Sequence, residues 1–306
     1  MSLINNYGIY NLMTFKLFLL LEKLLMLLPK SYRKGFFSFL AHLAYYISSR
    51  YRRVAYKNLD FVFGDEMNDQ EKKEITKYSF KNLLFNFMHL MEFKRMSKKD
   101  VLAKISVKNI EAVQKANKEN RAIIYVTPHY CAWELGAVSV GLADKPINAV
   151  FKKLKNMKYQ DWMLESRSKF GNICLEKSNV LKSLIKVMRD KGSTGIVVDS
   201  SMNKREGVEI EFLGKKTRQT ATPAYLARKF DAAIIPVTIK TNDENKYELI
   251  FFDEIIVNKT DDEEKDILEA TQLQADWLSK LIRDDPKFWF WIHRRWKAEH
   301  PDIYKK

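Results

Sequence analysis

The prediction of the fold rests first on the stretch AIIYVTPHYCAWE at residues 122–134. The apolar run at 122–126 is typical of a short buried strand, because it is brief and rich in β-branched and aromatic residues. Thr127 and Pro128 then supply an N-cap and a first-turn residue, the signals with which helices begin. The stretch therefore predicts a strand that passes directly into a helix, the repeating unit of α/β proteins.

Strands and helices continue to alternate downstream of this stretch. Short apolar runs predict buried strands, and the segments between them predict helices. The predicted strands lie at 147–151, 196–198, 233–239 and 247–252, and the predicted helices near 129–142, 156–170, 178–190, 220–229 and 262–283. We expect an α/β fold with a mostly parallel central sheet flanked by helices, with the strand at 147–151 beside the one at 122–126. Such sheets place their sites at the C-terminal ends of the strands.

The chain of 306 residues exceeds the usual size of one domain but is short for two. Residues 67–117 have a helical pattern, with apolar positions three and four apart. We expect a membrane-associating helical segment at 1–60 and a second domain at 61–306. Its α/β core is predicted at about 118–260 and its C-terminal helices at 261–306.

The charge balance is strongly basic, with 53 Lys and Arg against 38 Asp and Glu. This excess suits a partner that carries phosphates or carboxylates, whether nucleic acid, anionic lipid or an acidic protein. Hydrophobic residues make up 46% of the chain, which excludes a disordered protein. The two cysteines are too few for a disulfide framework and indicate a reducing, cytoplasmic setting for the globular part.

The N-terminal stretch MTFKLFLLLEKLLMLL at 13–28 resembles a membrane span but is interrupted by Lys16, Glu22 and Lys23. A second apolar stretch at 36–47 is followed by a basic cluster. We expect an anchor that lies in or dips into the bilayer, because apolar runs mixed with basic residues bind anionic membrane surfaces. A spanning helix and a buried helical hairpin remain alternatives.

His129 and Glu134 are the candidate catalytic pair. Five positions along a regular helix rotate the chain by about 500°, which places the two side chains about 140° apart, so they cannot meet within one helix. They can meet if His129 lies in the turn before the helix and Glu134 reaches back to orient its imidazole. The pair would then be a general base with an orienting carboxylate, able to take a proton from a hydroxyl. A histidine that only caps the turn is the alternative.

Other chemistries fit the sequence less well. The spacing lacks the two histidines that a zinc metalloprotease requires, and no glycine-rich phosphate loop is present. Cys131 is a rival nucleophile, but a packed, inert thiol is the favoured interpretation because its side chain and that of His129 diverge at a helix start. We expect no metal ion at the site.

Four stretches carry a resemblance to a known family: TPHYCAWE at 127–134, FKKLKNMKYQDWMLESRSKFG at 151–171, the block at 199–237, and WIHRRWK at 291–297. In this order and at these separations they resemble the bacterial lipid A late acyltransferases, which are lysophospholipid acyltransferase-like lauroyl or myristoyl transferases. Two departures stand out. Ser201 occupies a position where a second aspartate is usual, and Lys153 and Met157 occupy positions where prolines are common.

The resemblance implies a glycerolipid acyltransferase-like fold, with His129 as the catalytic histidine and Glu134 as its acidic partner. It implies transfer of an acyl chain from acyl carrier protein to a hydroxyl of a Kdo-bearing lipid A precursor, without a cofactor, at the cytoplasmic face of the bacterial inner membrane. Basic and polar side chains are expected to bind the phosphorylated acceptor or the carrier. These are Lys152, Asn156, Arg167, Asp199, Arg228, Arg294 and Arg295.

Three other functions remain open on the sequence. A glycerophospholipid acyltransferase would use the same chemistry on lysophosphatidic acid or a related acceptor. A thioesterase would use water as the acceptor. A membrane-tethered nucleic-acid-binding protein would use the basic and aromatic residues without needing His129, and we expect no nucleic-acid partner.

Overall fold

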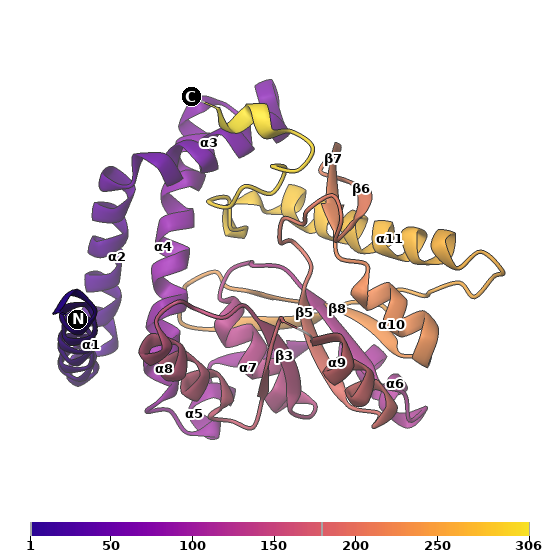
Figure 1. Ribbon diagram of the computed structural model, residues 1–306, viewed down its shortest axis with the longest axis horizontal. Coiled ribbons are helices and arrows are strands. Elements are labelled where there is room, and N and C mark those ends of the chain that lie inside the picture. The colour runs from indigo at the N-terminus through magenta and orange to yellow at the C-terminus, as the bar shows by residue number, and fades with distance from the viewer. Residues whose placement is uncertain (1, 179, 306) are drawn as a thin grey trace.

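The computed structural model describes residues 2–178 and 180–305 and centres on a seven-stranded sheet (Figure 1). The strand order is β1-β9-β8-β2-β5-β3-β4, and every neighbouring pair is parallel except β8 and β9. The strands are β1 (Ile105–Lys108), β2 (Ile123–Thr127), β3 (Ile147–Phe151), β4 (Ile173–Glu176), β5 (Ser193–Val197), β8 (Ala233–Lys240) and β9 (Tyr247–Phe251). This confirms the predicted α/β fold with a mostly parallel sheet.

Helices cover both faces of the sheet, as a parallel sheet buried on both sides requires. Alternate residues of β2 therefore enter different clusters, so that Tyr125 packs with Val113 and Val140 from one face while Ile124 packs with Leu184 and Leu226 from the other. The first face carries α6 (Glu111–Lys118) and α7 (Trp133–Ala143), and the second carries α9 (Val180–Arg189) and α10 (Thr222–Phe230). The helix α8 (Met157–Ser168) lies between β3 and β4 in the chain, and α11 (Glu263–Asp284) follows β9.

An N-terminal group of helices packs beside the sheet rather than on it (Figure 1). It comprises α1 (Ser2–Leu27), α2 (Lys30–Ile47), α3 (Ser49–Phe63) and α4 (Asp69–Phe93), followed by the short α5 (Lys98–Leu102). Both α2 and α3 pack on α4, and their buried residues belong to the same core cluster as the sheet. The boundary predicted at residue 60 falls inside α3 and remains a prediction.

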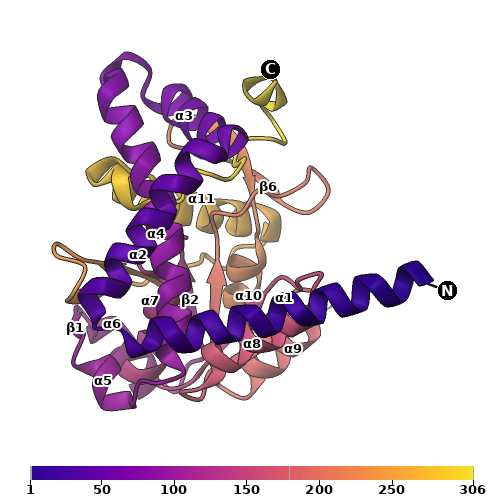
Figure 2. The ribbon, with the colours of Figure 1, turned by 90° about the vertical axis from the view of Figure 1, so that its left-hand side faces the viewer.

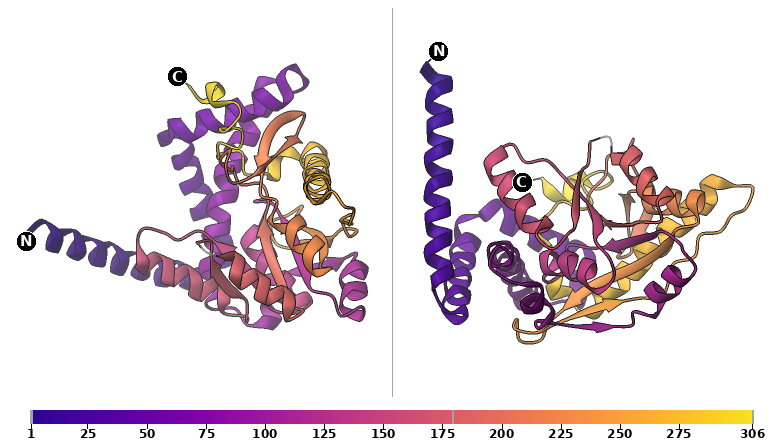
Figure 3. Two further views of the ribbon diagram at one scale, coloured as in Figure 1. Left: turned by 45° about the vertical axis from the view of Figure 1, so that its right-hand side comes forward. Right: turned by 90° about the horizontal axis from the view of Figure 1, so that it is seen from below.

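Helix α1 is docked along part of its length and extends beyond the α/β body at its other end (Figures 2 and 3). Phe18 packs edge-on against Trp162 of α8, and the Trp162 Nε1–H donates to the buried carboxylate of Glu22 at 3.0 Å. None of the helices in the described part is both long and apolar enough to cross a membrane.

Several predicted elements differ from the structure. The stretch 67–117 is not continuously helical, because α4, α5, β1 and α6 succeed one another there. Short exposed strands such as β1, and a strand of polar residues such as β7 (Lys215–Gln219), lack the apolar runs by which buried strands are recognised. The strand β4 and the antiparallel hairpin of β6 (Val208–Phe212) and β7 were therefore missed. The prediction that β3 adjoins β2 is wrong as well, since β5 pairs with both.

The chain after α11 is a tail of short 3-10 turns, Pro286–Phe288 and Pro301–Tyr304, rather than the helix predicted there. Its indole rings at Trp289, Trp291 and Trp296 are fully buried. Asn58 of α3 secures the tail by donating to the main-chain carbonyls of Trp291 at 2.8 Å and His293 at 2.7 Å. These bonds matter because a buried main-chain carbonyl without a hydrogen bond is costly. The buried indole rings make the tail part of the core.

Gly207 fixes the approach of the β6–β7 hairpin to the loop that precedes it. A Cβ at this position would lie 2.7 Å from the main-chain oxygen of Gln219 and 2.9 Å from Cβ of Met202. Gly207→Ala should lower the free energy of unfolding by about 1–3 kcal/mol, because backbone must move to admit the methyl group. Thermal unfolding measures this. Gly35→Ala, in the open on helix α2, is the matched control and should be neutral or stabilising; equal melting temperatures for the two variants would contradict the close approach.

Candidate active site

His129 lies in the loop between the end of β2 and the start of α7. The helix begins at Trp133 with Ala132 as N-cap, so the N-cap predicted at Thr127 is wrong. The loop is possible because Cys131 adopts a φ of 50°, a left-handed conformation that is uncommon for a residue other than glycine. His129 therefore occupies a turn at the C-terminal end of a central strand, as the catalytic interpretation required.

The partner of the imidazole is Asp199, which follows β5. His129 Nδ1 lies 2.9 Å from Asp199 Oδ1, and the main-chain N–H of His129 donates to Oδ2 at 2.8 Å. Trp289 Nε1–H donates to the same Oδ2 at 2.9 Å. The prediction that Glu134 orients the imidazole is therefore wrong, and Asp199, predicted as a substrate-binding residue, takes that place. Because β5 adjoins β2, the ends of these two strands bring His129 and Asp199 together.

The electrostatics of this pair favour a base whose free nitrogen is Nε2. Asp199 is fully buried, and although burial raises the pKa of its carboxyl, His129 outweighs that effect and holds the pKa well below its usual range. Burial lowers the pKa of His129, but the Asp199 carboxylate outweighs this and the net pKa is raised. An ionised Asp199 accepts from Nδ1–H, so Nε2 is left as the acceptor of the neutral ring.

Glu134 instead forms a two-pronged ion pair with Arg167 of α8. Arg167 Nε donates to Oε2 at 2.9 Å and Nη2 donates to Oε1 at 2.5 Å. Burial lowers the pKa of Arg167, and the Glu134 carboxylate outweighs it and raises the pKa. The guanidinium fork predicted to clamp a phosphate is thus already engaged, because the first turn of α7 and the last turn of α8 meet here. Both residues still border the cavity described next.

A cavity of about 620 Å³ opens beside His129, whose side chain remains 33% exposed. Its lining includes the charged or titratable side chains of His129, Glu134, Arg167 and Lys152. Its remaining wall is largely apolar and comes from α7, α9 and the strands β2, β3, β5 and β8, with Val140, Ile147, Val150, Leu184, Ile196, Val197, Val237 and Ile239 among the lining residues. A volume of this size suits a small-molecule or lipid-chain ligand.

Glycine keeps part of this cavity open. Gly195 on β5 lines it, and a Cβ there would lie 3.1 Å from Cδ1 of Ile147. Gly136 on α7 also lines it, and its Cβ would lie 3.2 Å from Cγ2 of Ile239. The absence of both side chains widens the space between the helix and the sheet. Ser201 borders the same cavity at the position where the resemblance led us to note a missing aspartate.

Three of the predicted substrate-binding residues contact other parts of the protein, and their role in substrate binding remains a prediction. Asn156 caps α8 by accepting from the Lys158 main-chain N–H at 3.1 Å. Arg228 donates from Nε to the buried Asp266 at 2.9 Å, which ties α10 to α11. The guanidinium of Arg294 stacks over the ring of Tyr304, 5.5 Å from its centre. These three residues lie outside the cavity lining. Their contacts within the protein could not be predicted from their positions in the sequence.

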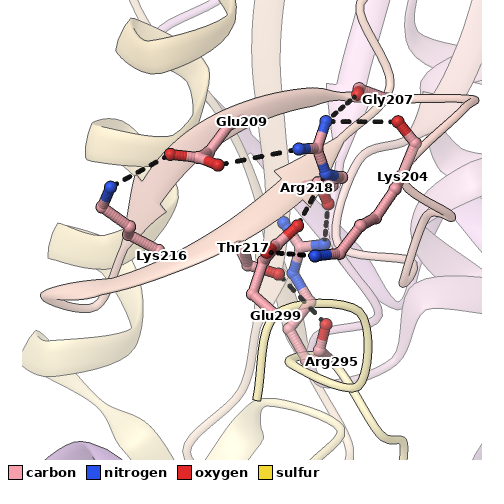
Figure 4. Close-up of polar contacts among 8 residues, drawn as sticks. All are labelled: Lys204, Gly207, Glu209, Lys216, Thr217, Arg218, Arg295 and Glu299. Atoms are coloured by element: carbon pink, nitrogen blue, oxygen red, sulfur yellow. Dashed lines mark hydrogen bonds and ion pairs between the residues drawn. The ribbon is translucent and has the colours of Figure 1, made fainter. Parts of the chain in front are cut away.

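Arg295 is fully buried and also serves the fold. Its Nη1 donates to the main-chain carbonyls of Ser200 at 2.9 Å and Arg218 at 2.5 Å. Figure 4 shows how the network continues, with Arg218 Nε donating to Glu299 at 2.7 Å and Nη1 donating to Gly207 at 3.0 Å. The C-terminal tail is thereby tied both to the hairpin and to the segment that follows Asp199. Burial lowers the pKa of Arg295 to about 10.

Two further residues shape the site although they were not predicted as site residues. Asn86 of α4 accepts from the Glu134 main-chain N–H at 3.0 Å and donates to the Cys131 carbonyl at 2.8 Å, fixing the His129 loop. In the sequence, Asn86 could have been noticed as a polar residue within an apolar helical stretch, because a buried polar side chain needs a hydrogen-bond partner. For Trp289 the sequence offered no signal of its bond to Asp199 beyond its place in the aromatic tail. Cys131 itself is buried, in agreement with a packed thiol, and burial raises the pKa of that thiol to about 12, which disfavours the nucleophilic thiolate.

His129 and the buried carboxylate of Asp199 thus lie together at the C-terminal edge of a mostly parallel sheet, and His129 borders an apolar cavity. This arrangement is typical of a general base beside a ligand pocket. The chain belongs to the bacterial lipid A biosynthesis acyltransferase family, whose model matches residues 6–298. It is therefore an acyltransferase, and the resemblance found in its sequence motifs is confirmed.

Individual relatives are distant. The chain is 22% identical over 251 residues to the lipid A biosynthesis palmitoleoyltransferase of Escherichia coli (strain K12), covering 81% of this chain and 79% of that one. It is 22% identical over 264 residues to a lipid A biosynthesis acyltransferase of Haemophilus influenzae, covering 84% and 80%. A phosphatidylinositol mannoside acyltransferase of Mycolicibacterium smegmatis is 23% identical over 202 residues, which cover 65% and 64%.

The pairing of His129 with Asp199 predicts a specific pH dependence. The base must be neutral, so kcat/KM should rise as the pH passes the raised pKa of His129. Asp199→Asn removes the negative charge, so the midpoint of that rise should move to lower pH, and kcat should fall by about 10²–10⁴. Asp276→Asn, on the exposed face of α11, is the control and should change neither. An unshifted midpoint in Asp199→Asn would mean that Asp199 does not act on the base.

Proposed function

We propose that this acyltransferase moves a fatty acyl chain from acyl carrier protein to a hydroxyl of a Kdo-bearing, phosphorylated lipid A precursor. The observation that carries the proposal is the position of the His129 imidazole, bonded to Asp199 through Nδ1 and bordering an apolar cavity. A base at that place can serve a hydroxyl acceptor while the chain of the acyl donor occupies the cavity. The names of the Escherichia coli and Haemophilus influenzae relatives support lipid A as the product class.

The chemistry follows from this geometry. His129 Nε2 takes the proton of the acceptor hydroxyl as its oxygen attacks the thioester carbonyl, and the imidazolium that forms is stabilised by the ionised Asp199. The tetrahedral intermediate then expels the carrier thiolate, which recovers the proton from Nε2. No nucleophile on the enzyme is needed, because the thioester is already activated, and the raised pKa of the Cys131 thiol agrees with that.

Basic side chains in the cavity lining suit the charges of both substrates. Lys152 and Lys177 line the cavity, and Arg167 lies beside them with Nη1 outside its two bonds to Glu134. Phosphates of the acceptor and the acidic surface of a carrier protein are both attracted to such a group. The role of these residues in substrate binding is part of the proposal. A glycerophospholipid acceptor would suit them equally, so the assay must compare acceptors.

We further propose that the enzyme works at the cytoplasmic face of the inner membrane, bound through α1 and α2. Large apolar side chains remain exposed on these helices and are flanked by basic residues, a combination that binds anionic lipid surfaces. The most exposed are Met13, Leu17, Leu20, Leu24, Leu27, Tyr32, Phe39, Tyr46 and Ile47. So many exposed large apolar side chains on two successive helices are unusual on a protein surrounded only by water.

Acyl transfer in vitro tests the proposed function. Wild-type protein supplied with acyl carrier protein thioester and a Kdo-bearing lipid A precursor should yield acylated lipid, and His129→Ala should lower turnover by about 10²–10⁴ while the protein stays folded. Parallel reactions with lysophosphatidic acid and with no acceptor distinguish the alternatives. Preferred acylation of lysophosphatidic acid, or release of free fatty acid alone, would overturn the proposal.

Vesicle binding tests the membrane proposal. Leu20→Glu with Leu24→Glu, on the exposed face of α1, should weaken binding to anionic phospholipid vesicles by more than tenfold, because each buried leucine contributes about 2 kcal/mol. Leu268→Glu with Leu273→Glu, on the exposed face of α11, is the matched control and should bind like wild type. Sedimentation with vesicles measures both. Equal losses in the two double variants would place the membrane contact elsewhere.

A further inference from the structure

The C-terminal tail runs against both segments that carry the catalytic pair. The Phe290 main-chain N–H donates to the His129 carbonyl at 3.0 Å, and the Cys131 N–H donates to the Phe288 carbonyl at 2.9 Å. On the Asp199 side, Trp289 Nε1–H donates to the carboxylate at 2.9 Å. The tail is therefore placed to control the geometry of the pair as well as to fill the core.

His293 makes the contact of this tail with the Asp199 main chain. Its Nε2 lies 3.0 Å from the Asp199 carbonyl oxygen, and its Nδ1 lies 2.6 Å from the Phe290 carbonyl oxygen. The ring is stacked on Phe290 and packed edge-on against Trp289. These contacts give the ring little freedom, so a shift of His293 would be transmitted to Asp199.

Both neighbours of the ring are acceptors, which restricts what the ring can do. A neutral imidazole has one N–H and can serve one carbonyl, whereas the imidazolium serves both. Burial lowers the pKa of His293, and Asp199 opposes that effect, while His129 and Arg295 add to it. Donation to Asp199 therefore requires an N–H at Nε2, either in the imidazolium or in the Nε2–H tautomer.

We propose that His293 is a positioning residue for acyl transfer, which holds the main-chain carbonyl of Asp199 through Nε2–H so that the carboxylate is aimed at Nδ1 of His129. The inference rests on the proposed function, and it assigns to the tail a role in turnover rather than in binding substrate. Arg295 acts beside it by donating to the next carbonyl, that of Ser200. Two consecutive carbonyls after β5 are thus fixed from the tail.

Amide side chains separate the two contacts of His293. Glutamine places an N–H near the position of Nε2 and keeps the bond to Asp199, whereas asparagine places one near Nδ1 and keeps only the bond to Phe290. His293→Gln should retain most of the wild-type kcat. His293→Asn should lower kcat by about tenfold to a hundredfold with little change in KM, because misplacing a catalytic group by less than 1 Å is costly. His300→Gln, on the same tail, is the control and should match wild type.

The pKa of His129 provides a second readout. The groups that face His129 are Asp199, which raises its pKa most, Glu134, which also raises it, and Arg167, which lowers it. Poor alignment of Asp199 should therefore lower the His129 pKa in His293→Asn and leave it near the wild-type value in His293→Gln. NMR titration of the imidazole measures this without any substrate. Melting temperatures of the variants show that each is folded.

The outcomes separate the two proposals. If wild-type protein transfers no acyl group to any lipid, the proposed function fails, and the NMR titration still decides whether His293 controls His129. If transfer occurs and His293→Asn matches His293→Gln in kcat and in the His129 pKa, the positioning role is wrong. If His293→Asn matches wild type while His293→Gln is impaired, the contact with Phe290 matters instead and the inference is overturned.

Discussion

A fully buried carboxylate at Asp199 is the constraint on which the rest of this site depends. An ionised carboxylate removed from water is costly unless hydrogen bonds and opposite charge replace its hydration. Three donors do so here, namely the imidazole Nδ1–H and the main-chain N–H of His129 and the indole N–H of Trp289. These donors come from the β2–α7 loop and from the C-terminal tail. Their bonds to the Asp199 carboxylate therefore hold together that loop, the tail and the segment after β5.

The same constraint gives the imidazole two different sides. Nδ1 is bonded to Asp199, and the side chain borders an apolar cavity whose lining includes basic residues. In the proposed function this base takes the proton of a hydroxyl on the acceptor, and the apolar cavity wall suits an aliphatic chain. The ion pair of Glu134 and Arg167 closes the edge between α7 and α8 beside it. The acidic residue of the His-x4-Glu motif thus stabilises the surroundings of the base rather than its ring.

Sequence patterns predicted the parts of this protein that depend on periodicity and on local signals. The strands β2, β3, β8 and β9 appear close to their predicted bounds because each is a short run dominated by aliphatic, β-branched and aromatic residues. His129 was identified because it follows such a strand and lies five residues before Glu134 in a motif that resembles the family's. The partner of His129 was assigned to Glu134, which is near in sequence, whereas the structure gives Asp199. Asp199 is 70 residues away in sequence but follows β5, which lies beside β2 in the sheet. Strand order is set by tertiary packing, which a single sequence does not reveal.

The basic residues were the hardest to assign for a related reason. Arg228 and Arg295 carry the same guanidinium as Arg167, yet Arg228 bonds to Asp266 and Arg295 bonds to main-chain carbonyls, and neither lines the cavity. An arginine in a motif is equally suited to bind a phosphate, a carboxylate or a carbonyl, so its role depends on which partner the fold delivers. Only Lys152 and Arg167 among the predicted basic residues border the cavity. The C-terminal tail shows the same difficulty. Its aromatic and basic residues suggested a binding surface, but Trp289, His293 and Arg295 contact Asp199 and Ser200.

Mass spectrometry of lipid A tests the central claim, that His129 acts as the base for acylation of this lipid, most directly. The source bacterium would be compared with the gene intact, deleted, and restored either as wild type or as His129→Ala at equal protein level. The account predicts that deletion removes one acyl chain from lipid A, that the wild-type gene restores it, and that the variant does not. Lipid A of unchanged acylation after deletion, or full restoration by His129→Ala, would contradict it.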